Sequence, residues 1–88
     1  MKKTYQVRVD ARVARELSRV PIVDAKRLIA AMEALAKNPR PRGATKLVDQ
    51  PGWRVRVGVY RILYQVDDDA GAVTVFRAGH RREIYRRT

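Results

Sequence analysis

The chain has 88 residues, of which 45% are apolar, so it can form one small hydrophobic core, and we predict a single domain over residues 1–88. Twenty lysines and arginines against nine acidic residues give a net charge of +11, so we expect an anionic partner, with nucleic acid phosphates as first candidate. The absence of cysteine excludes disulfides and thiolate chemistry. No stretch is long and apolar enough to cross a membrane, and the first residues do not resemble a signal segment, so we expect a cytoplasmic protein without a membrane partner.

Residues 5–9 alternate apolar and polar side chains, which predicts a first strand with one buried face. Asp10 is suited to cap a short helix through its carboxylate. The buried stripe of this helix would consist of Val13, Leu17 and Val20. Pro21 suits the first turn of a second helix, which Asn38 and Pro39 end. The second helix has one apolar face made of Ala25, Leu28, Ile29, Met32, Leu35 and Ala36.

Residues 40–52 are rich in proline and glycine and predict a connection. Leu47 and Val48 would pair briefly with the sheet or pack under it. The cations of this connection, among them Lys46, would extend the basic surface of the segment that follows.

Residues 53–66 predict a β-hairpin, because apolar and polar side chains alternate on both sides of a glycine. One face carries Trp53, Val55, Val57, Tyr60, Ile62, Tyr64 and Val66. If residues 58–59 form a two-residue loop, Gly58 suits a type II′ turn and Arg56 lies directly across from Arg61. Like charges placed opposite each other destabilise a hairpin by a few tenths to roughly 1 kcal/mol. A polyanion-binding surface and a solvated face that happens to be basic both account for this pairing.

Asp67, Asp68 and Asp69 predict a turn rather than a metal site, since no glutamate or histidine nearby completes a ligand set. Residues 72–78 predict a last strand whose phase stays open, because a shift of one residue in the loop turns every side chain to the other face. Gly79 indicates a bend or bulge where the strand leaves the sheet. The tail, residues 79–88, holds four arginines and the only histidine.

The element order is strand, helix, helix, strand, strand, strand. This order predicts an α+β fold in which two N-terminal helices pack on one face of a mainly antiparallel four-stranded sheet. The other face, which carries Arg54, Arg56 and Arg61, would be left open.

The residue types exclude many enzyme classes. The lone serine, Ser18, lies in a helix without an expected histidine partner, and no glycine-rich loop or set of metal ligands is visible, so neither a metal nor another cofactor is expected. RNA cleavage by its own 2′-OH remains possible, because arginines fixed on strands can stabilise the charge on the phosphorane. A tyrosine or histidine would then exchange protons. From the residues alone we favour a packed aromatic at Tyr85 and a polar strand-end residue at His80.

Two segments, W-R-V-R-V-G-V-Y-R-I-L-Y at residues 53–64 and A-G-H-R-R-E-I-Y at residues 78–85, resemble the RelE branch of the RelE/ParE toxin superfamily. The likeness covers almost the whole chain, including its length and element order, and the two motifs are specific when found together. The resemblance implies a toxin of a prokaryotic type II toxin–antitoxin system. It further implies a metal-independent, ribosome-dependent endoribonuclease that cleaves mRNA in the A site by 2′-OH attack and leaves a 2′,3′-cyclic phosphate.

The resemblance also implies which residues act. The catalytic set carried over from the family is Arg54, Arg56, Arg61, Arg81 and Tyr85. Further RNA-binding residues are Lys46, His80 and Arg82, of which Arg82 is an alternative to Arg81. The family often has lysine at the first two positions, and because arginine cannot accept a proton at neutral pH, Tyr85 or His80 would take that role. Tyr85 would be a general base or a stacking platform for the base, and Arg81 would assist the leaving group or stabilise charge.

The partners that the resemblance implies are a cognate antitoxin and the ribosome with its mRNA and rRNA. An acidic antitoxin segment would cover the basic face or displace the C-terminal tail. Operator DNA would be bound only through the toxin–antitoxin complex.

Two other functions stay open. One is a ParE-like toxin that inhibits DNA gyrase and cleaves nothing, although the arginine and tyrosine set favours the nuclease. The other is a noncatalytic RNA-binding module, which would need several aromatic side chains on the open face of the sheet for base stacking. The predicted pairing places Tyr60 and Tyr64 on the core face, which argues against that module.

Overall fold

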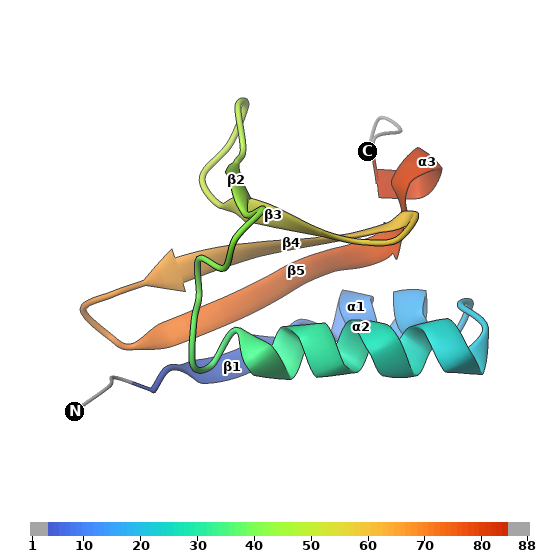
Figure 1. Ribbon diagram of the computed structural model, residues 1–88, viewed down its shortest axis with the longest axis horizontal. Coiled ribbons are helices and arrows are strands. Elements are labelled where there is room, and N and C mark those ends of the chain that lie inside the picture. The colour runs from blue at the N-terminus through green and yellow to red at the C-terminus, as the bar shows by residue number, and fades with distance from the viewer. Residues whose placement is uncertain (1–3, 85–88) are drawn as a thin grey trace.

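The computed structural model describes residues 4–84 and has the predicted α+β architecture (Figure 1). The elements in chain order are β1 (Gln6–Val9), α1 (Ala11–Leu17), α2 (Ile22–Ala34), β2 (Thr45–Lys46), β3 (Trp53–Val57), β4 (Tyr60–Asp67), β5 (Ala72–His80) and α3 (Arg81–Ile84). None of the helices in residues 4–84 is long and apolar enough to cross a membrane.

The sheet has five strands in the order β1-β5-β4-β3-β2, one more than predicted. Only the pair of β1 with β5 is parallel. The additional strand is β2, in which Thr45 pairs with Arg54 and Lys46 with Trp53. Pairing or packing was expected for the neighbouring Leu47 and Val48; Leu47 is half-buried with its N–H bonded to the Gly52 carbonyl, whereas Val48 is exposed and does neither.

Both long helical segments lie on one face of the sheet, as predicted (Figure 1). The core beneath them includes Val13 from α1, and it includes Leu28 and Met32 from α2. Ile29 is 42% exposed, so its assignment to the buried face was wrong. Asp10 stands at the N-terminus of α1, but its side chain makes no capping hydrogen bond, contrary to the prediction.

The β3–β4 hairpin has the predicted register. Val57 pairs with Tyr60, and Arg56 lies directly opposite Arg61. Gly58 has a φ of 61°, and no residue other than glycine has a positive φ in the described part of the chain, which fits a type II′ turn at residues 58–59. The hairpin therefore forces two arginines onto neighbouring positions of one face.

A bulge in β5 resolves the phase that the sequence left open. Leu63 pairs with Arg77 but Tyr64 pairs with Val75, so one residue of β5 has no partner on β4 at this point. Because of the shift, Val75 before the bulge and Ala78 after it both face the core. The predicted irregularity at Gly79 thus occurs three residues earlier, and β5 continues regularly to His80.

The face opposite the long helices is not fully open. The short helix α3 lies on this face (Figure 1), and it buries Ile84 to 6% exposure. A Cβ built on Gly79 would lie 3.7 Å from Cδ1 of Ile84, an ordinary van der Waals distance, so α3 packs directly over this part of β5. Since Gly79 pairs with Arg61, α3 lies beside the arginines of the hairpin.

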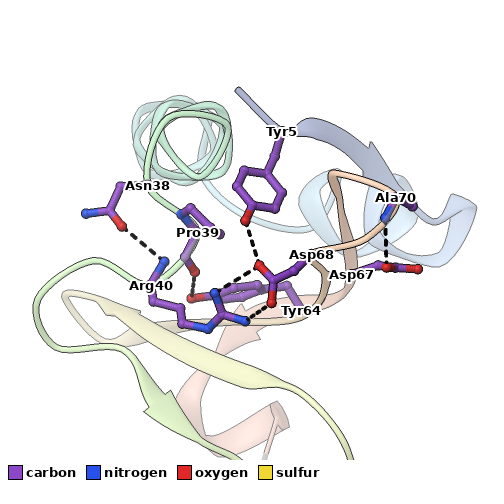
Figure 2. A network of polar contacts seen from close by, with 8 residues as sticks. All are labelled: Tyr5, Asn38, Pro39, Arg40, Tyr64, Asp67, Asp68 and Ala70. Carbon is purple, nitrogen blue, oxygen red and sulfur yellow. Dashed lines mark hydrogen bonds and ion pairs between the residues drawn. The ribbon is translucent and has the colours of Figure 1, made fainter. Parts of the chain in front are cut away.

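A polar joint fixes the far end of the sheet, where β4 turns into β5 (Figure 2). The Tyr5 hydroxyl donates to the Asp68 carboxylate at 2.6 Å, and the Arg40 guanidinium donates to both oxygens of that carboxylate at 2.8 and 3.3 Å. The Tyr64 hydroxyl donates to the Pro39 carbonyl at 2.7 Å. The turn predicted at the three aspartates is confirmed, and its middle carboxylate connects the N-terminal strand to the connection after α2.

Candidate functional site

Arginine side chains gather on the sheet face that carries α3. Arg54, Arg56 and Arg61 occupy alternate positions of β3 and β4 on the face opposite the core residues Val55 and Ile62. We call this surface the arginine face. The structure therefore brings three of the five predicted catalytic residues together on two adjacent strands.

Arg61 is a buried cation on this face, with 7% of its surface exposed. Its Nη1 donates to the carbonyl oxygens of Gly58 at 3.1 Å and Tyr60 at 2.9 Å, which holds the guanidinium against the turn. Its Nε has no hydrogen-bond partner among residues 4–84. A buried charge without a counter-ion carries a desolvation cost that only an added anion or a further hydrogen bond offsets.

Arg56, across the hairpin, is exposed. The ion pairs within residues 4–84 join Arg12 and Arg77 to Glu16, Arg27 to Asp24, and Arg40 to Asp68. None of them includes Arg56 or Arg61. Two adjacent guanidinium groups without a carboxylate form a site that favours a dianionic or polyanionic ligand, and the forked donors of arginine fit phosphate oxygens.

Arg81 and Arg82 begin α3 and are both exposed. The Arg81 N–H donates to the Val59 carbonyl at 2.8 Å, which ties the start of α3 to the turn of the hairpin. The Arg82 N–H donates to Nδ1 of His80 at 3.1 Å. The late arginines are thus anchored by their backbone at the same end of the sheet as Arg56 and Arg61.

Two predicted RNA-binding residues have cross-strand partners on the other face. His80 pairs with Tyr60 and Lys46 pairs with Trp53, and both partners pack against the core. Residues directly opposite each other in a ladder point to the same side of the sheet. His80 and Lys46 are therefore not brought together with the arginine face, and their RNA-binding roles stay predictions.

Tyr85, the fifth predicted catalytic residue, lies outside the described residues, and its role stays a prediction. Among the described tyrosines, burial raises the pKa of Tyr64 to about 12. The hydrogen bond that Tyr60 donates to Asp24 at 2.9 Å raises the pKa of Tyr60. Both shifts favour the protonated hydroxyl, and the Tyr60 and Tyr64 hydroxyls are already bonded to Asp24 and to the Pro39 carbonyl.

The sequence predictions included neither Glu16 nor Arg77, although these side chains form the best-buried ion pair of the described chain. Glu16 accepts from Nε of Arg77 at 2.8 Å and from the N–H of Ala78 at 2.9 Å. This contact fastens α1 to β5 beyond the end of β1. A signal for Glu16 was its position at i+4 from Arg12, but no local pattern indicated its partner on β5.

No group of three or more histidine, aspartate or glutamate side chains that could hold a metal ion occurs within the described residues.

Comparisons with known proteins define the class. A family model described as ParE toxin of type II toxin–antitoxin system, parDE, matches residues 7–85. Toxin RelG from Mycobacterium tuberculosis is 33% identical over 89 aligned positions, which cover 94% of this chain and 98% of that protein.

Solved structures agree with this class. The M. tuberculosis toxin–antitoxin complex RelBE2 contains a chain that is 26% identical, with a TM-score of 0.80 over 91% of this chain and 94% of that chain. A mutant of the Escherichia coli toxin RelE in the free state shares the fold, with 24% identity and a TM-score of 0.74 over 93% of this chain and 90% of that chain. The fold is thus that of a small toxin. The chain belongs to the RelE/ParE superfamily of type II toxin–antitoxin toxins.

Proposed function

We propose that this toxin is a ribosome-dependent endoribonuclease that cleaves mRNA in the A site and so inhibits translation. The observation that carries the proposal is Arg61, a buried guanidinium whose Nε has no partner among residues 4–84 and which faces a second arginine, Arg56. A scissile phosphate supplies the negative charge that this pair lacks. As the phosphorane forms, its charge grows, so preorganised donors bind it more tightly than the ground state.

The proposed reaction breaks one bond and forms another at the same phosphorus. The 2′-oxygen attacks, the bond from phosphorus to the 5′-oxygen breaks, and a 2′,3′-cyclic phosphate remains. The 2′-OH loses its proton to a base, and the leaving 5′-oxygen gains one. Tyr85 takes the proton from the 2′-OH, since arginine cannot accept a proton at neutral pH and His80 lies on the other face of the sheet, and the resulting acid or a water returns a proton to the 5′-oxygen. Arg54, Arg56 and Arg61 stabilise the phosphorane, and Arg81 or Arg82 stabilises the leaving group.

The proposed dependence on the ribosome is supported by the lack of a tyrosine suited to act as general base among the described residues. Tyr60 and Tyr64 have raised pKa values and are turned to the core. We therefore expect little or no cleavage of free RNA, and we propose that the ribosome positions the mRNA and its 2′-OH for attack. This activity would place the protein in the cytoplasm.

A cognate antitoxin is the proposed protein partner. The net charge of +11 supports an acidic antitoxin segment over the arginine face, and the similar M. tuberculosis protein RelBE2 was solved as a toxin–antitoxin complex. Operator DNA would be bound only through this complex, with the antitoxin making the specific contacts.

Mapping mRNA ends in cells after induction of the chain tests the proposal. We expect cuts within codons of translated messages, and we expect these cuts to disappear in Arg61→Ala and in Tyr85→Phe. Intact mRNA in growth-arrested cells would overturn the nuclease.

A gyrase inhibitor is the second candidate, because the matching family model is that of ParE toxins. Blocked replication with intact mRNA would favour it. Binding to programmed ribosomes without any cleavage would instead favour a noncatalytic RNA-binding module.

A further inference from the structure

A second basic region lies on the helix side of the sheet, near the end of β5. It is a cleft of about 750 Å³ between α1, the start of α2 and the last residues of β5. Its cationic lining consists of Arg12, Arg15, Arg19 and Arg77, and His80 also contributes to the wall. We call it the helix-side cleft. It differs from the arginine face in its cations, because Arg54, Arg56 and Arg61 are not among the residues that line it.

The acids in the helix-side cleft do not neutralise its cations. Glu16 is bound by Arg77 at 2.8 Å and lies 3.7 Å from Arg12, so this one carboxylate serves two guanidinium groups. The remaining acid of the lining is Glu83. Arg15 and Arg19 are exposed, and neither takes part in an ion pair within the described residues. The cleft therefore presents two uncompensated guanidinium groups to solvent.

His80 offers a fixed hydrogen-bond donor beside these arginines. Its Nδ1 accepts from the N–H of Arg82, so the neutral imidazole carries its proton on Nε2. Its ring stands edge to face with the ring of Tyr60, with centroids 5.9 Å apart. The Tyr60 hydroxyl is held by Asp24, so both aromatic rings are fixed in place. An anion in the cleft would meet two guanidinium groups and one imidazole N–H.

The arrangement of the cations favours a polyphosphate chain over a single small anion. Arg12 and Arg15 lie about 5 Å apart along α1 at a rise of about 1.5 Å per residue, and Arg19 follows in the turn after the helix. Arginines at separate positions along one wall can each contact a different phosphate of a nucleic acid chain. Gly79 lines the cleft and pairs with Arg61, so only the strand β5 separates the two basic regions.

We propose that the helix-side cleft is a second phosphate-binding site, in which Arg15, Arg19 and His80 hold a phosphodiester of RNA away from the scissile position. The inference rests on the proposed function only in taking RNA as the ligand. Its role is binding, and it includes no bond cleavage. The phosphodiester could come from the mRNA or from ribosomal RNA, since both offer the same chemistry.

The test uses the double variant Arg15→Gln, Arg19→Gln. The matched control is Lys26→Gln, Lys37→Gln, which removes two exposed positive charges outside the cleft. All four side chains are exposed, so we expect both proteins to fold like the unmodified chain. The probe is a labelled 2′-O-methyl RNA of twelve nucleotides, whose affinity is measured by fluorescence anisotropy over a range of KCl concentrations. Because this RNA cannot undergo 2′-OH attack, the result does not depend on nuclease activity.

We expect the cleft variant to lose about tenfold in affinity at low salt and to lower the slope of log affinity against log salt by about 1.4, since each lost single-strand phosphate contact accounts for about 0.7. The control should change the slope little. Equal RNA affinity and equal salt dependence of the two variants would contradict the proposed second phosphate-binding site. Weaker binding of a polyglutamate peptide with unchanged RNA binding would also overturn it, because the cleft would then be a protein site.

Sedimentation with ribosomes separates the two sources of phosphate. A loss of binding that appears only when mRNA is present assigns the cleft to the message, and an equal loss on empty ribosomes assigns it to ribosomal RNA. Unchanged binding to both would contradict the proposal. Absence of mRNA cleavage by the unmodified chain would instead count against the nuclease alone.

Discussion

The two ends of the sheet use arginine in opposite ways. At the β4–β5 end, the Arg40 guanidinium is paired with both oxygens of Asp68 (Figure 2). It also lies 5.3 Å from the centre of the Trp53 ring. At the β3–β4 end, Arg61 is bonded only to neutral carbonyls among the described residues and stands opposite Arg56. Among residues 4–84, a carboxylate neutralises Arg40 but neither Arg56 nor Arg61.

The difference separates a structural joint from a ligand site. The pairing of Arg40 and Asp68 connects segments that are distant in sequence, and it leaves little charge to attract a ligand. The repulsion between Arg56 and Arg61 lowers the stability of the hairpin, and their positive charge stays available to bind an anion. A charged group that costs stability without a partner in the fold is most simply explained by a partner outside it.

The largest expected effect is on cleavage. Arg61→Gln removes a fixed donor for the phosphorane, so we expect cleavage on programmed ribosomes to fall by about 100-fold to 1000-fold. Arg40→Gln at the other end is the matched control, since it removes the same charge and should leave the cleavage rate unchanged. A similar loss of rate in both variants, with both still folded by circular dichroism, would remove the distinction between the two ends.

The variant Tyr64→Phe tests how much the polar joint at the β4–β5 end of the sheet stabilises the fold. It removes the donor to the Pro39 carbonyl, a buried contact of 2.7 Å, and should lower the free energy of unfolding by about 1–3 kcal/mol. Urea unfolding at pH 7 measures the change. Unchanged stability would show that the carbonyl finds another partner.

The same variant should show a pH dependence with a defined sign. Burial raises the pKa of Tyr64 from 10.0 to about 12, so below pH 10 its contribution to stability is fully present. As the pH rises from 10.0 to about 12, the unfolded chain loses this proton first, and the unmodified protein loses stability. Phenylalanine cannot titrate, so the gap between the two proteins should narrow over this range. A constant gap would contradict the raised pKa.

Asp68→Asn should have a smaller effect. Its partners are partly exposed, so solvent screens the ion pair, and we expect the melting temperature to fall by about 4–8 °C, which corresponds to roughly 1 kcal/mol in a domain of this size. Cleavage on ribosomes should not change. Differential scanning calorimetry and the cleavage assay together test whether the joint is purely structural.

The smallest expected effect is a gain in melting temperature. Arg56→Gln removes the like charge opposite Arg61, so the melting temperature should rise by about 1–4 °C while cleavage falls. A lower melting temperature would mean that Arg56 contributes to the fold through contacts that outweigh the repulsion.

The alternation of side chains along the sequence predicted the hairpin part of the site. The register of the hairpin followed from strict alternation and from a glycine at the turn, so the opposition of Arg56 and Arg61 was predictable. The burial of Arg61 was not, because alternation predicts the face of a side chain and not how deeply neighbouring elements cover it. His80 lies on the same side of the sheet as its cross-strand partner Tyr60, and the sequence did not predict that pairing.

The bulge in β5 shows why the strand phase could not be settled. Val75 and Ala78 are an odd number of positions apart and both face the core, which no regular strand allows. The two residues that follow the extra residue, Arg77 and Ala78, both donate to the Glu16 carboxylate of α1. Only the packing of α1 against β5 fixes that position.

The central claim is that the arginine face binds the phosphate that the reaction cleaves. Its most direct measurement is cleavage by the purified chain on ribosomes programmed with a defined mRNA, beside the same mRNA carrying a single 2′-deoxy nucleotide at the cut position. We expect a cut in the A-site codon of the first message with a 2′,3′-cyclic phosphate end, no cut in the second, and almost none in free RNA. Efficient cleavage of the deoxy-substituted message, or of free RNA, would contradict the account.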